Sequence, residues 1–386
     1  MKARSKRLPA VLLLFGIIYL LHFAGKRPQL PSLERRLTSK FSSQDEMPIE
    51  KHIWQSWKTR ERLGKEFKEN TQLWAASTDY NYHFLDDDQA LDFVEKYYAE
   101  FPEVIHAYRI LPRKVLRADF FRYLVVLAQG GIYADIDTRL NVRVDAWLKD
   151  AQIARIAREY GISMANISAI IGVEDECDCW GWRAVFTRRL QFCQWTFAAK
   201  RGHPIFVDLV SKTTHLTLNN YDASSGLLTF PKGYKGMGNT APVYNMTEGS
   251  NSWYEGILEW TGPGPFTDSI FHYLNTYYAT YFKDLLEGSD NVVSCSSDKQ
   301  CFIDPNKPLD IISNLQYPPP HGDNLLGRKL PRQPLGWENF TMIEEPILVG
   351  SVVILPKKYF NQKHATDPTE NYVEHGFKGT WKWSQS

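Results

Sequence analysis

The chain has 386 residues, enough for one large domain or two modest ones. Hydrophobic residues make up 43% of it and charged residues 23%, as in an ordinary globular protein. The formal net charge is +1 and no basic stripe occurs beyond the extreme N-terminus, so the composition argues against a nucleic-acid partner. Aromatic residues reach 14%, which suits a carbohydrate-binding cleft as well as an aromatic core.

The N-terminal segment has the pattern of a membrane anchor. Four basic residues within positions 1–7 precede an uncharged, mainly apolar run from Leu8 to Ala24. A membrane-spanning helix needs about 17–25 such residues, and a basic flank favours the cytoplasmic side. We therefore predict a cytoplasmic tail at 1–7, a transmembrane signal anchor at 8–24 and a luminal remainder. A cleaved signal peptide is the alternative, although no small-x-small cleavage site follows the run.

Residues 25–47 are polar and contain Pro and Ser, which predicts a luminal stem ahead of a domain at 48–386. Three acceptor sequences for N-glycosylation agree with a luminal location. They begin at Asn166, Asn245 and Asn339.

The five cysteines favour disulfide chemistry over a metal site. Cys295 and Cys301 flank a short polar loop and can pair, whereas Cys177, Cys179 and Cys193 leave at least one thiol odd. A zinc site is disfavoured because this spacing does not match the usual ligand pattern.

The elements that follow alternate between strand and helix. "IEKHIWQSWKT" at 49–59 is typical of a buried strand, and "DYNYHFLDDDQALDFVEKYY" at 79–98 of a strand and then a helix opened by aspartates. Residues 113–129 have helical spacing of apolar residues and end at a glycine pair, and "IYADI" reads as the next strand. This alternation predicts an α/β fold with a mostly parallel sheet and flanking helices. After residue 150 the pattern loosens.

Two aspartates close the strand that follows the glycine pair. Alternation would place Tyr133, Asp135 and Asp137 on one face, with Ile132, Ala134 and Ile136 on the other. Neighbouring carboxylates repel each other unless a positive charge lies between them. Mg²⁺ and Mn²⁺ prefer oxygen ligands, so we predict a divalent cation at this pair, outside the carboxyl end of a strand.

Several stretches together resemble the family 32 glycosyltransferases, most closely the fungal initiation-specific α-1,6-mannosyltransferases of the Golgi. They run in order along the chain: "IEKHIWQSWKT", "LRADFFRYLVVLAQGGIYADIDT", "RRLQFCQWTFAAKRGHPIF", "TGPGPFTD" and "HATDPTENYVEHGFKGTWK". The resemblance implies a GT-A fold, a GDP-mannose donor, Mn²⁺ or Mg²⁺ as cofactor, and an N-glycan acceptor on glycoproteins. It also implies a single-pass type II protein of the Golgi membrane, with a Golgi mannosyltransferase complex as a possible partner.

The resemblance assigns the cation to Asp135, Asp137 and His375. Asp137 is the direct ligand of the two carboxylates, and Asp135 reaches the donor ribose, or the metal through water. The spacing from His375 to Gly379 is one residue longer than in the HxxGxxK segment of other GT-A enzymes. In that segment the lysine, here Lys382, contacts phosphate.

Further site residues follow from the same resemblance. Asp119 and Arg122, three apart on a helix, would bind the donor sugar and phosphate; a surface ion pair is the plain alternative. Tyr133 is a donor contact, and Arg117 serves either the core or the acceptor. Trp54 would stack on the base, with burial in the core as the alternative. Asp268, in a loop at 261–268, would have a catalytic role near the transferred sugar, with a tight connection before the next helix as the alternative.

The function implied is transfer of mannose in α-1,6 linkage to an N-glycan core with retention of configuration, which initiates an outer chain. No nucleophile is evident, so front-side attack by the acceptor is the default. The alternatives are another family 32 hexosyltransferase with a different donor or acceptor, and a non-catalytic lectin or subunit of a mannan-building complex. A haloacid-dehalogenase phosphatase is disfavoured, because Arg139 stands where its D-x-D motif needs Thr or Val.

Overall fold

The computed structural model describes most of the segment predicted to be luminal. The described ranges are 32–42, 47–61, 63–77, 79–147, 149–159, 161–176, 186–230, 243–247, 253–285, 293–295, 301–303, 335–360 and 371–377. The predicted tail and anchor at 1–24 lie outside them, as do Cys177, Cys179, Gly379 and Lys382. Within the described ranges, no helix is both long enough and apolar enough to cross a membrane.

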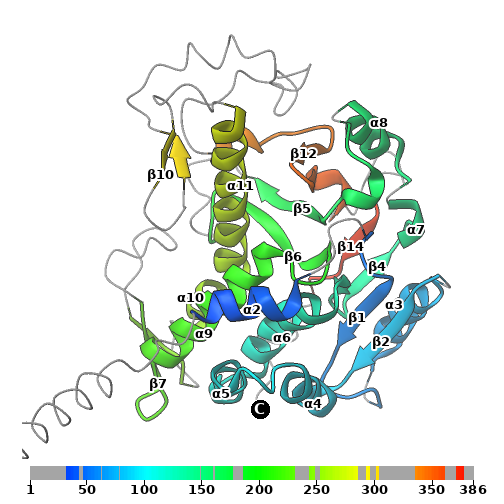
Figure 1. Ribbon diagram of the computed structural model, residues 1–386. Coiled ribbons are helices and arrows are strands. Elements are labelled where there is room, and N and C mark those ends of the chain that lie inside the picture. Colours follow the sequence, from blue (N-terminus) through cyan, green and yellow to red (C-terminus); the bar gives the residue numbers. More distant parts are fainter. Residues whose placement is uncertain are drawn as a thin grey trace, which may run out of the picture.

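A seven-stranded mixed sheet forms the centre of the molecule, with strand order β12-β13-β5-β6-β3-β1-β2 (Figure 1). The strands are β1 (His52–Ser56), β2 (Asn81–Leu85), β3 (Gly131–Ala134), β5 (Ala169–Glu176), β6 (Leu190–Ala199), β12 (Ile347–Val349) and β13 (Val352–Leu355). Strands β2, β1, β3, β5 and β13 run in one direction, while β6 and β12 run against it. The predicted α/β fold with a mostly parallel sheet is thus confirmed.

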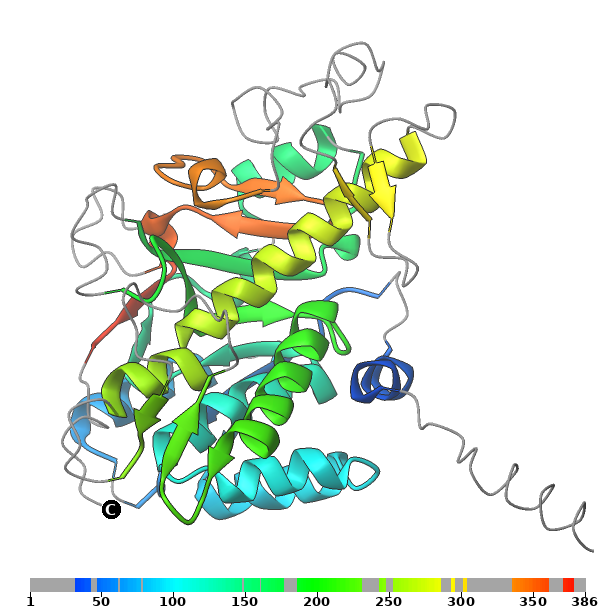
Figure 2. The same ribbon diagram turned by 90° about the vertical axis from the view of Figure 1, so that its left-hand side faces the viewer.

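Helices cover both faces of the sheet, which gives three layers (Figure 1). One face carries α4 (Asp87–Tyr97), α5 (Pro102–Ile110), α6 (Lys114–Gln129), α9 (Pro204–Asn220), α10 (Trp253–Trp260) and α11 (Pro263–Leu285). The other carries α3 (Lys65–Ala75), α7 (Val144–Trp147), α8 (Ala151–Glu159) and the ribbon β4 (Thr138–Leu140) with β14 (Val373–His375). Figure 2 shows α11 running along its side of the sheet.

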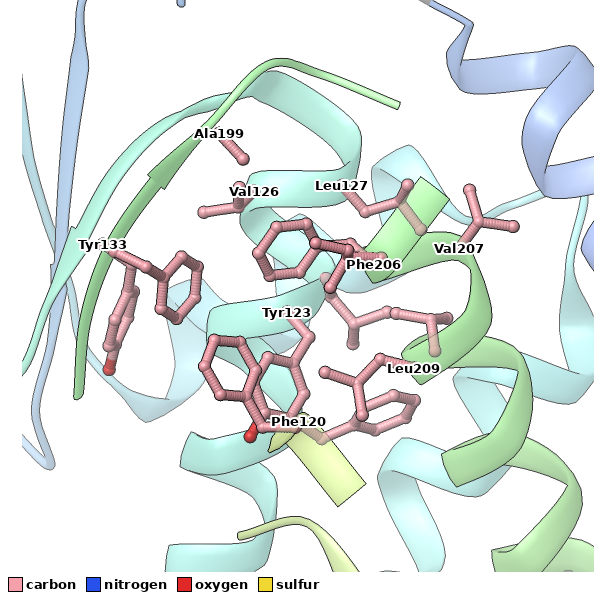
Figure 3. Close-up of a cluster of buried hydrophobic side chains, with 14 of the residues drawn as sticks. Phe120, Tyr123, Val126, Leu127, Tyr133, Ala199, Phe206, Val207 and Leu209 are labelled. Atoms are coloured by element: carbon pink, nitrogen blue, oxygen red, sulfur yellow. The ribbon is translucent and has the colours of Figure 1, made fainter. Parts of the chain in front are cut away.

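The larger core lies between the sheet and helices α6 and α9. Aromatic and aliphatic side chains from both helices meet Tyr133 of β3 and Ala199 of β6 there (Figure 3). Tyr133 belongs to this core, while its neighbours Ile132 and Ala134 belong to the core on the opposite face. The predicted alternation of faces is therefore confirmed up to Ala134.

The folded part begins earlier than the sequence predicted. Helix α2 (Leu33–Phe41) lies within the segment assigned to the stem, and its apolar residues Leu33, Leu37 and Phe41 are buried against the larger core. Arg36 and Lys40 on the same helix pair with Glu103 and Glu100. The stem prediction is wrong for residues 33–41, because three apolar residues four apart make a helix face that packs on the domain.

The turn from α6 to β3 depends on the glycine pair, as predicted. Gly130 caps α6 with φ +65°, and Gly131 begins β3 with φ +97°. A Cβ atom on Gly131 would lie 2.5 Å from the carbonyl oxygen of His52 on the adjacent strand. Only glycine allows β1 and β3 to approach so closely.

The described part also contains shorter elements. These are β7 (Tyr221–Asp222), β8 (Leu227–Thr229), β9 (Val243–Asn245), β10 (Val293–Cys295), β11 (Cys301–Ile303), and the 3-10 turns η1 (Met164–Asn166), η4 (Trp337–Asn339) and η5 (Lys357–Tyr359). Cys295 and Cys301 stand opposite each other in the β10–β11 register, so their disulfide stays a prediction. Cys193 is buried with a free thiol.

Candidate active site

A cavity of about 770 Å³ opens at the carboxyl edge of the parallel strands. The ends of β1, β3 and β5 contribute Ser56, Asp135 and Glu174 to its wall, and α6 contributes Asp119 and Arg122. This is the edge where ligands bind in open α/β sheets.

The D-x-D pair lies in the turn after β3 instead of on the strand. The strand ends at Ala134, and Asp135, Ile136 and Asp137 all line the cavity. The prediction that Ile136 faces away is wrong, because alternation stops where the strand stops. The turn is held by a hydrogen bond from Thr138 N–H to the Asp135 carbonyl at 3.1 Å.

His375 joins this turn from the far end of the chain. In the antiparallel pairing of β14 with β4, His375 stands opposite Thr138, and Gly376 N–H donates to the Asp137 carbonyl at 2.8 Å. The His375 Nε2 atom lies 3.1 Å from Asp137 Oδ1. One ligand atom each from Asp135, Asp137 and His375 lie within 4.8 Å of one another.

This cluster fits the predicted divalent cation. The two carboxylates supply oxygen ligands and the imidazole supplies a nitrogen ligand. Mn²⁺ binds both kinds readily, whereas Mg²⁺ prefers the oxygens. The Nδ1 atom of His375 is buried without a hydrogen-bond partner among the described residues. Its other ring nitrogen, Nε2, faces Asp137 and is the atom that can join the two carboxylates at a cation.

Arg122 links the D-x-D turn to α6. Its guanidinium lies 2.6 Å from Asp119 and 3.3 Å from Asp135. Burial raises the pKa of Asp119 to about 7, although Arg122 opposes the rise. Burial also raises the pKa of Asp135, again against Arg122. The alternative of a surface ion pair is wrong, because Asp119 and Arg122 belong to a buried network at the cavity wall.

Tyr133 lies next to this network. Its hydroxyl lies 3.2 Å from the Ser56 hydroxyl, and the Arg122 guanidinium carbon lies 5.3 Å from the centre of its ring. Both Tyr133 and Ser56 line the cavity. The structure thus brings Tyr133 together with three other predicted donor contacts, Asp119, Arg122 and Asp135.

Trp54 is not brought to the cavity. Its indole is 5% exposed, donates to the Gly130 carbonyl at 2.9 Å and stacks on His83 with ring centres 4.1 Å apart. The position favours the core alternative. Trp57, three residues later, follows the last residue of β1 and does line the cavity.

Asp268 also lies away from the cavity lining. Residues 263–268 form the first turns of α11 instead of a loop, since prolines at 263 and 265 occupy positions where a helix needs no N–H donor. The Asp268 carboxylate accepts hydrogen bonds from Arg188 at 2.8 and 2.6 Å. Arg188 also binds the fully buried Glu259. The catalytic role of Asp268 gains no support from this position.

Comparisons with known proteins agree with the geometry. Residues 64–154 match the model of the "Glycosyltransferase sugar-binding region containing DXD motif" family. The chain is 30% identical to the initiation-specific alpha-1,6-mannosyltransferase of Candida albicans over 92% of its own length and 78% of the relative's. It is also 30% identical to the enzyme of the same name from Saccharomyces cerevisiae, over 92% of its own length and 83% of the relative's. This chain belongs to the family of D-x-D glycosyltransferases that includes these two relatives.

A solved structure, PaToxG glycosyltransferase, is more distant. It matches 66% of this chain and 79% of its own with 14% identity and a TM-score of 0.36.

The glycosyltransferase has cavity residues that sequence reasoning did not select. Glu174 accepts hydrogen bonds from Gln191 at 2.6 Å and from Trp195 at 3.0 Å. Burial raises the pKa of Glu174. Lys58 also lines the cavity. Arg117, for which the sequence left the core and the acceptor open, lines the cavity as well. The only sequence signal was the position of these residues after or near predicted strand ends.

The predicted glycosylation sites of this glycosyltransferase lie outside the cavity lining. Asn166 is exposed, whereas Asn245 and Asn339 are half-buried. The Asn245 side-chain oxygen accepts from the Thr247 hydroxyl of its own acceptor sequence at 2.6 Å, and the Asn339 oxygen accepts from Gly336 N–H at 2.8 Å. Glycosylation at all three stays a prediction.

Proposed function

We propose that this glycosyltransferase transfers mannose from GDP-mannose to an N-linked glycan core in α-1,6 linkage, the step that starts an outer chain. The observation that carries the proposal is the 30% identity to two initiation-specific alpha-1,6-mannosyltransferases over 92% of the chain. The similarity extends far beyond residues 64–154, the part shared with the broader D-x-D family.

The cation site in this proposal consists of Asp135, Asp137 and His375. A bound Mn²⁺ or Mg²⁺ would stabilise the negative charge that develops on the departing diphosphate. The two carboxylates lie at the cavity edge, with side chains 23% and 15% exposed, so they can meet a ligand without moving from the turn.

The donor sugar and phosphates would lie against α6. The Asp119 carboxylate accepts hydrogen bonds and suits sugar hydroxyls, and Arg122 offers donors to sugar or phosphate. Thr261 donates to the second Asp119 oxygen at 3.1 Å and fixes the carboxylate. Lys382, outside the described residues, is proposed to contact phosphate as in the resemblance.

The base end of the donor would lie where β1 and β2 end. Trp57 N–H donates to the Leu85 carbonyl at 3.1 Å, so the strand ends are adjacent there. An aromatic ring at a cavity wall can stack on a nucleotide base. We therefore assign base stacking to Trp57 in place of Trp54.

An α-linked donor and an α-linked product mean retention of configuration. Both oxygens of Glu174 and both of Asp119 accept hydrogen bonds from protein donors, and we assign no nucleophile. The acceptor hydroxyl would attack from the side of the leaving phosphate, and the phosphate oxygen would take its proton. In this proposal the domain has a GT-A fold and is anchored in the Golgi membrane by residues 8–24, alone or within a mannosyltransferase complex.

The test is a transfer assay with the purified protein, Mn²⁺, a panel of nucleotide sugars and a Man8 or Man9 N-glycan. The expected result is an α-1,6-linked mannose from GDP-mannose only, found by mass spectrometry and linkage analysis. Asp137→Asn should abolish transfer, whereas Asp222→Asn, at the exposed end of β7, should not. Transfer from another donor, or to another acceptor only, would support the alternative family 32 activity. Absence of any transfer would support a non-catalytic role.

A further inference from the structure

The orientation of His375 needs an explanation. A metal-ligating histidine is normally held by a hydrogen bond from its second ring nitrogen to a carboxylate, carbonyl or water. The Nδ1 atom of His375 is buried and has no such partner among the described residues. Its Nε2 atom faces Asp137, so among the described residues a stacking contact fixes the plane of the ring, beside the edge-on Phe377 ring at 4.1 Å.

The Trp195 indole provides that contact. Its ring and the imidazole of His375 are stacked with centres 4.6 Å apart and planes within 5° of parallel. Trp195 lies on β6, is 3% exposed and also contacts the Phe360 ring. Because close packing prevents the indole from rotating, its face restricts the imidazole to one plane.

Glu174 in turn holds the indole. Trp195 Nε1–H donates to one oxygen of Glu174 at 3.0 Å, and Gln191 donates to the other at 2.6 Å. The Gln191 side-chain oxygen accepts from the Thr187 hydroxyl at 2.8 Å and from its N–H at 3.2 Å. The amide of Gln191 cannot flip without losing both bonds, so its NH₂ group points at Glu174.

We propose that Glu174 and Trp195 are positioning residues that orient the His375 imidazole for a divalent cation, where no described residue bonds to Nδ1. The inference rests on the proposed function, since it concerns the same cation site. Glu174 also lines the cavity, but its two oxygens are taken by fixed donors, which favours a positioning role over attack on the sugar.

The experiment measures binding of Mn²⁺ alone to the purified full chain by electron paramagnetic resonance of free Mn²⁺. Trp195→Leu removes the stacking surface and should weaken Mn²⁺ binding about ten- to hundredfold, the usual effect of losing an outer-shell partner. Trp195→Phe keeps a ring and should lose less. Glu174→Gln sets an amide NH₂ against that of Gln191 and should weaken binding several-fold, with little change in volume.

The matched control is Trp260→Leu. Trp260 is also fully buried and donates to a side chain, the Thr217 hydroxyl at 2.9 Å, but it lies in the core on the opposite face of the sheet. Its variant should melt at a lower temperature and bind Mn²⁺ as the wild type does. Loss of affinity in Trp195→Leu with no loss in Trp260→Leu would exclude a general packing effect.

The outcomes separate this inference from the proposed function. If the wild type does not bind Mn²⁺, or Asp137→Asn binds it equally, the cation site itself is wrong and both proposals fail there. If Asp137→Asn loses binding while Trp195→Leu and Glu174→Gln bind like the wild type, only the positioning role is overturned. Should Trp195→Leu fail to fold, Glu174→Gln and Trp195→Phe decide the matter. Loss of transfer in Glu174→Gln at unchanged Mn²⁺ affinity would instead place Glu174 against the substrate.

Discussion

Arg122 donates a 2.6 Å hydrogen bond to the Asp119 carboxylate three residues before it on α6, and their side chains are only 6% and 5% exposed. The same guanidinium lies 3.3 Å from Asp135 at the D-x-D turn. A single arginine thus compensates two carboxylates in the cavity wall. Buried charges of this kind cost free energy when a partner is removed, which makes the network testable by its stability as well as by activity.

Arg122→Ala should lower the free energy of unfolding by about 3–5 kcal/mol, because the buried Asp119 and Asp135 carboxylates lose the guanidinium that compensates their charge. Transfer activity should be lost as well. Chemical denaturation at neutral pH measures the stability change. The control is Arg155→Ala, which removes surface pairs with Glu159 at 3.2 Å and Glu345 at 2.7 Å and should change stability by less than about 1 kcal/mol. Equal effects of the two variants would show that the buried network contributes nothing special.

Trp57 and Trp54 should separate donor binding from stability. Trp57→Ala removes the aromatic surface at the cavity wall, and base stacking is worth about 1–3 kcal/mol, so GDP affinity should fall about tenfold or more. Trp54→Phe leaves the Gly130 carbonyl without its donor and should lower stability by about 1–3 kcal/mol at unchanged GDP affinity. Calorimetry with GDP and Mn²⁺ measures the first effect, and denaturation the second. The reverse pattern would restore Trp54 as the base contact.

The two tryptophans show that the exact end of a strand could not be predicted from the sequence. The strand at 52–56 was predicted within a longer window, but its last residue decides whether position 54 or 57 reaches the carboxyl edge. A shift of three residues exchanges a core position for a cavity position. The end of β3 had the same effect on Ile136, which was predicted to face away and instead lines the cavity.

Other parts of the site were predicted because their signals are local. The helix that ends at Gly130, the glycine pair and the two aspartates all lie within 25 residues, and the structure confirms their order. His375 is 238 residues from Asp137 and entered only through the family resemblance, because pairing of β14 with β4 leaves no local pattern. Residues 33–41 did carry one, since Leu33, Leu37 and Phe41 are four apart, but a Pro- and Ser-containing context favoured a stem.

His203 should make stability depend on pH. It is 3% exposed, lies 3.0 Å from the Ser168 hydroxyl and accepts from Ile205 N–H through Nδ1. Burial, with a smaller effect of Lys200, lowers the pKa of His203 to about 3. Above pH 6.5 the ring is neutral in both states. Between pH 6.5 and 3 the unfolded chain binds a proton that the folded chain does not, so the free energy of unfolding falls as pH falls.

The free energy of unfolding should fall by about 1.4 kcal/mol per pH unit through His203, or by about 2 kcal/mol between pH 6.5 and 5. Denaturation of His203→Asn at both pH values should show that much less pH dependence than the wild type. His215→Asn, at an exposed position, is the matched variant and should keep the wild-type dependence. If His203→Asn also keeps it, the folded ring takes up its proton at an ordinary pH and the burial argument is wrong.

Gly131→Ala should destabilise the chain far more than an ordinary glycine replacement. The φ of +97° is strained for any residue with a side chain, and the new Cβ would meet the His52 carbonyl at 2.5 Å. Strain and overpacking each cost about 1–3 kcal/mol, so thermal and chemical denaturation should show a loss of about 2–5 kcal/mol. Gly64→Ala provides the comparison, because its Cβ meets nothing within 4 Å. Similar stability of the two variants would mean that β1 and β3 can separate without cost. In that case the close contact between these strands would not be what places Asp135 at the cavity.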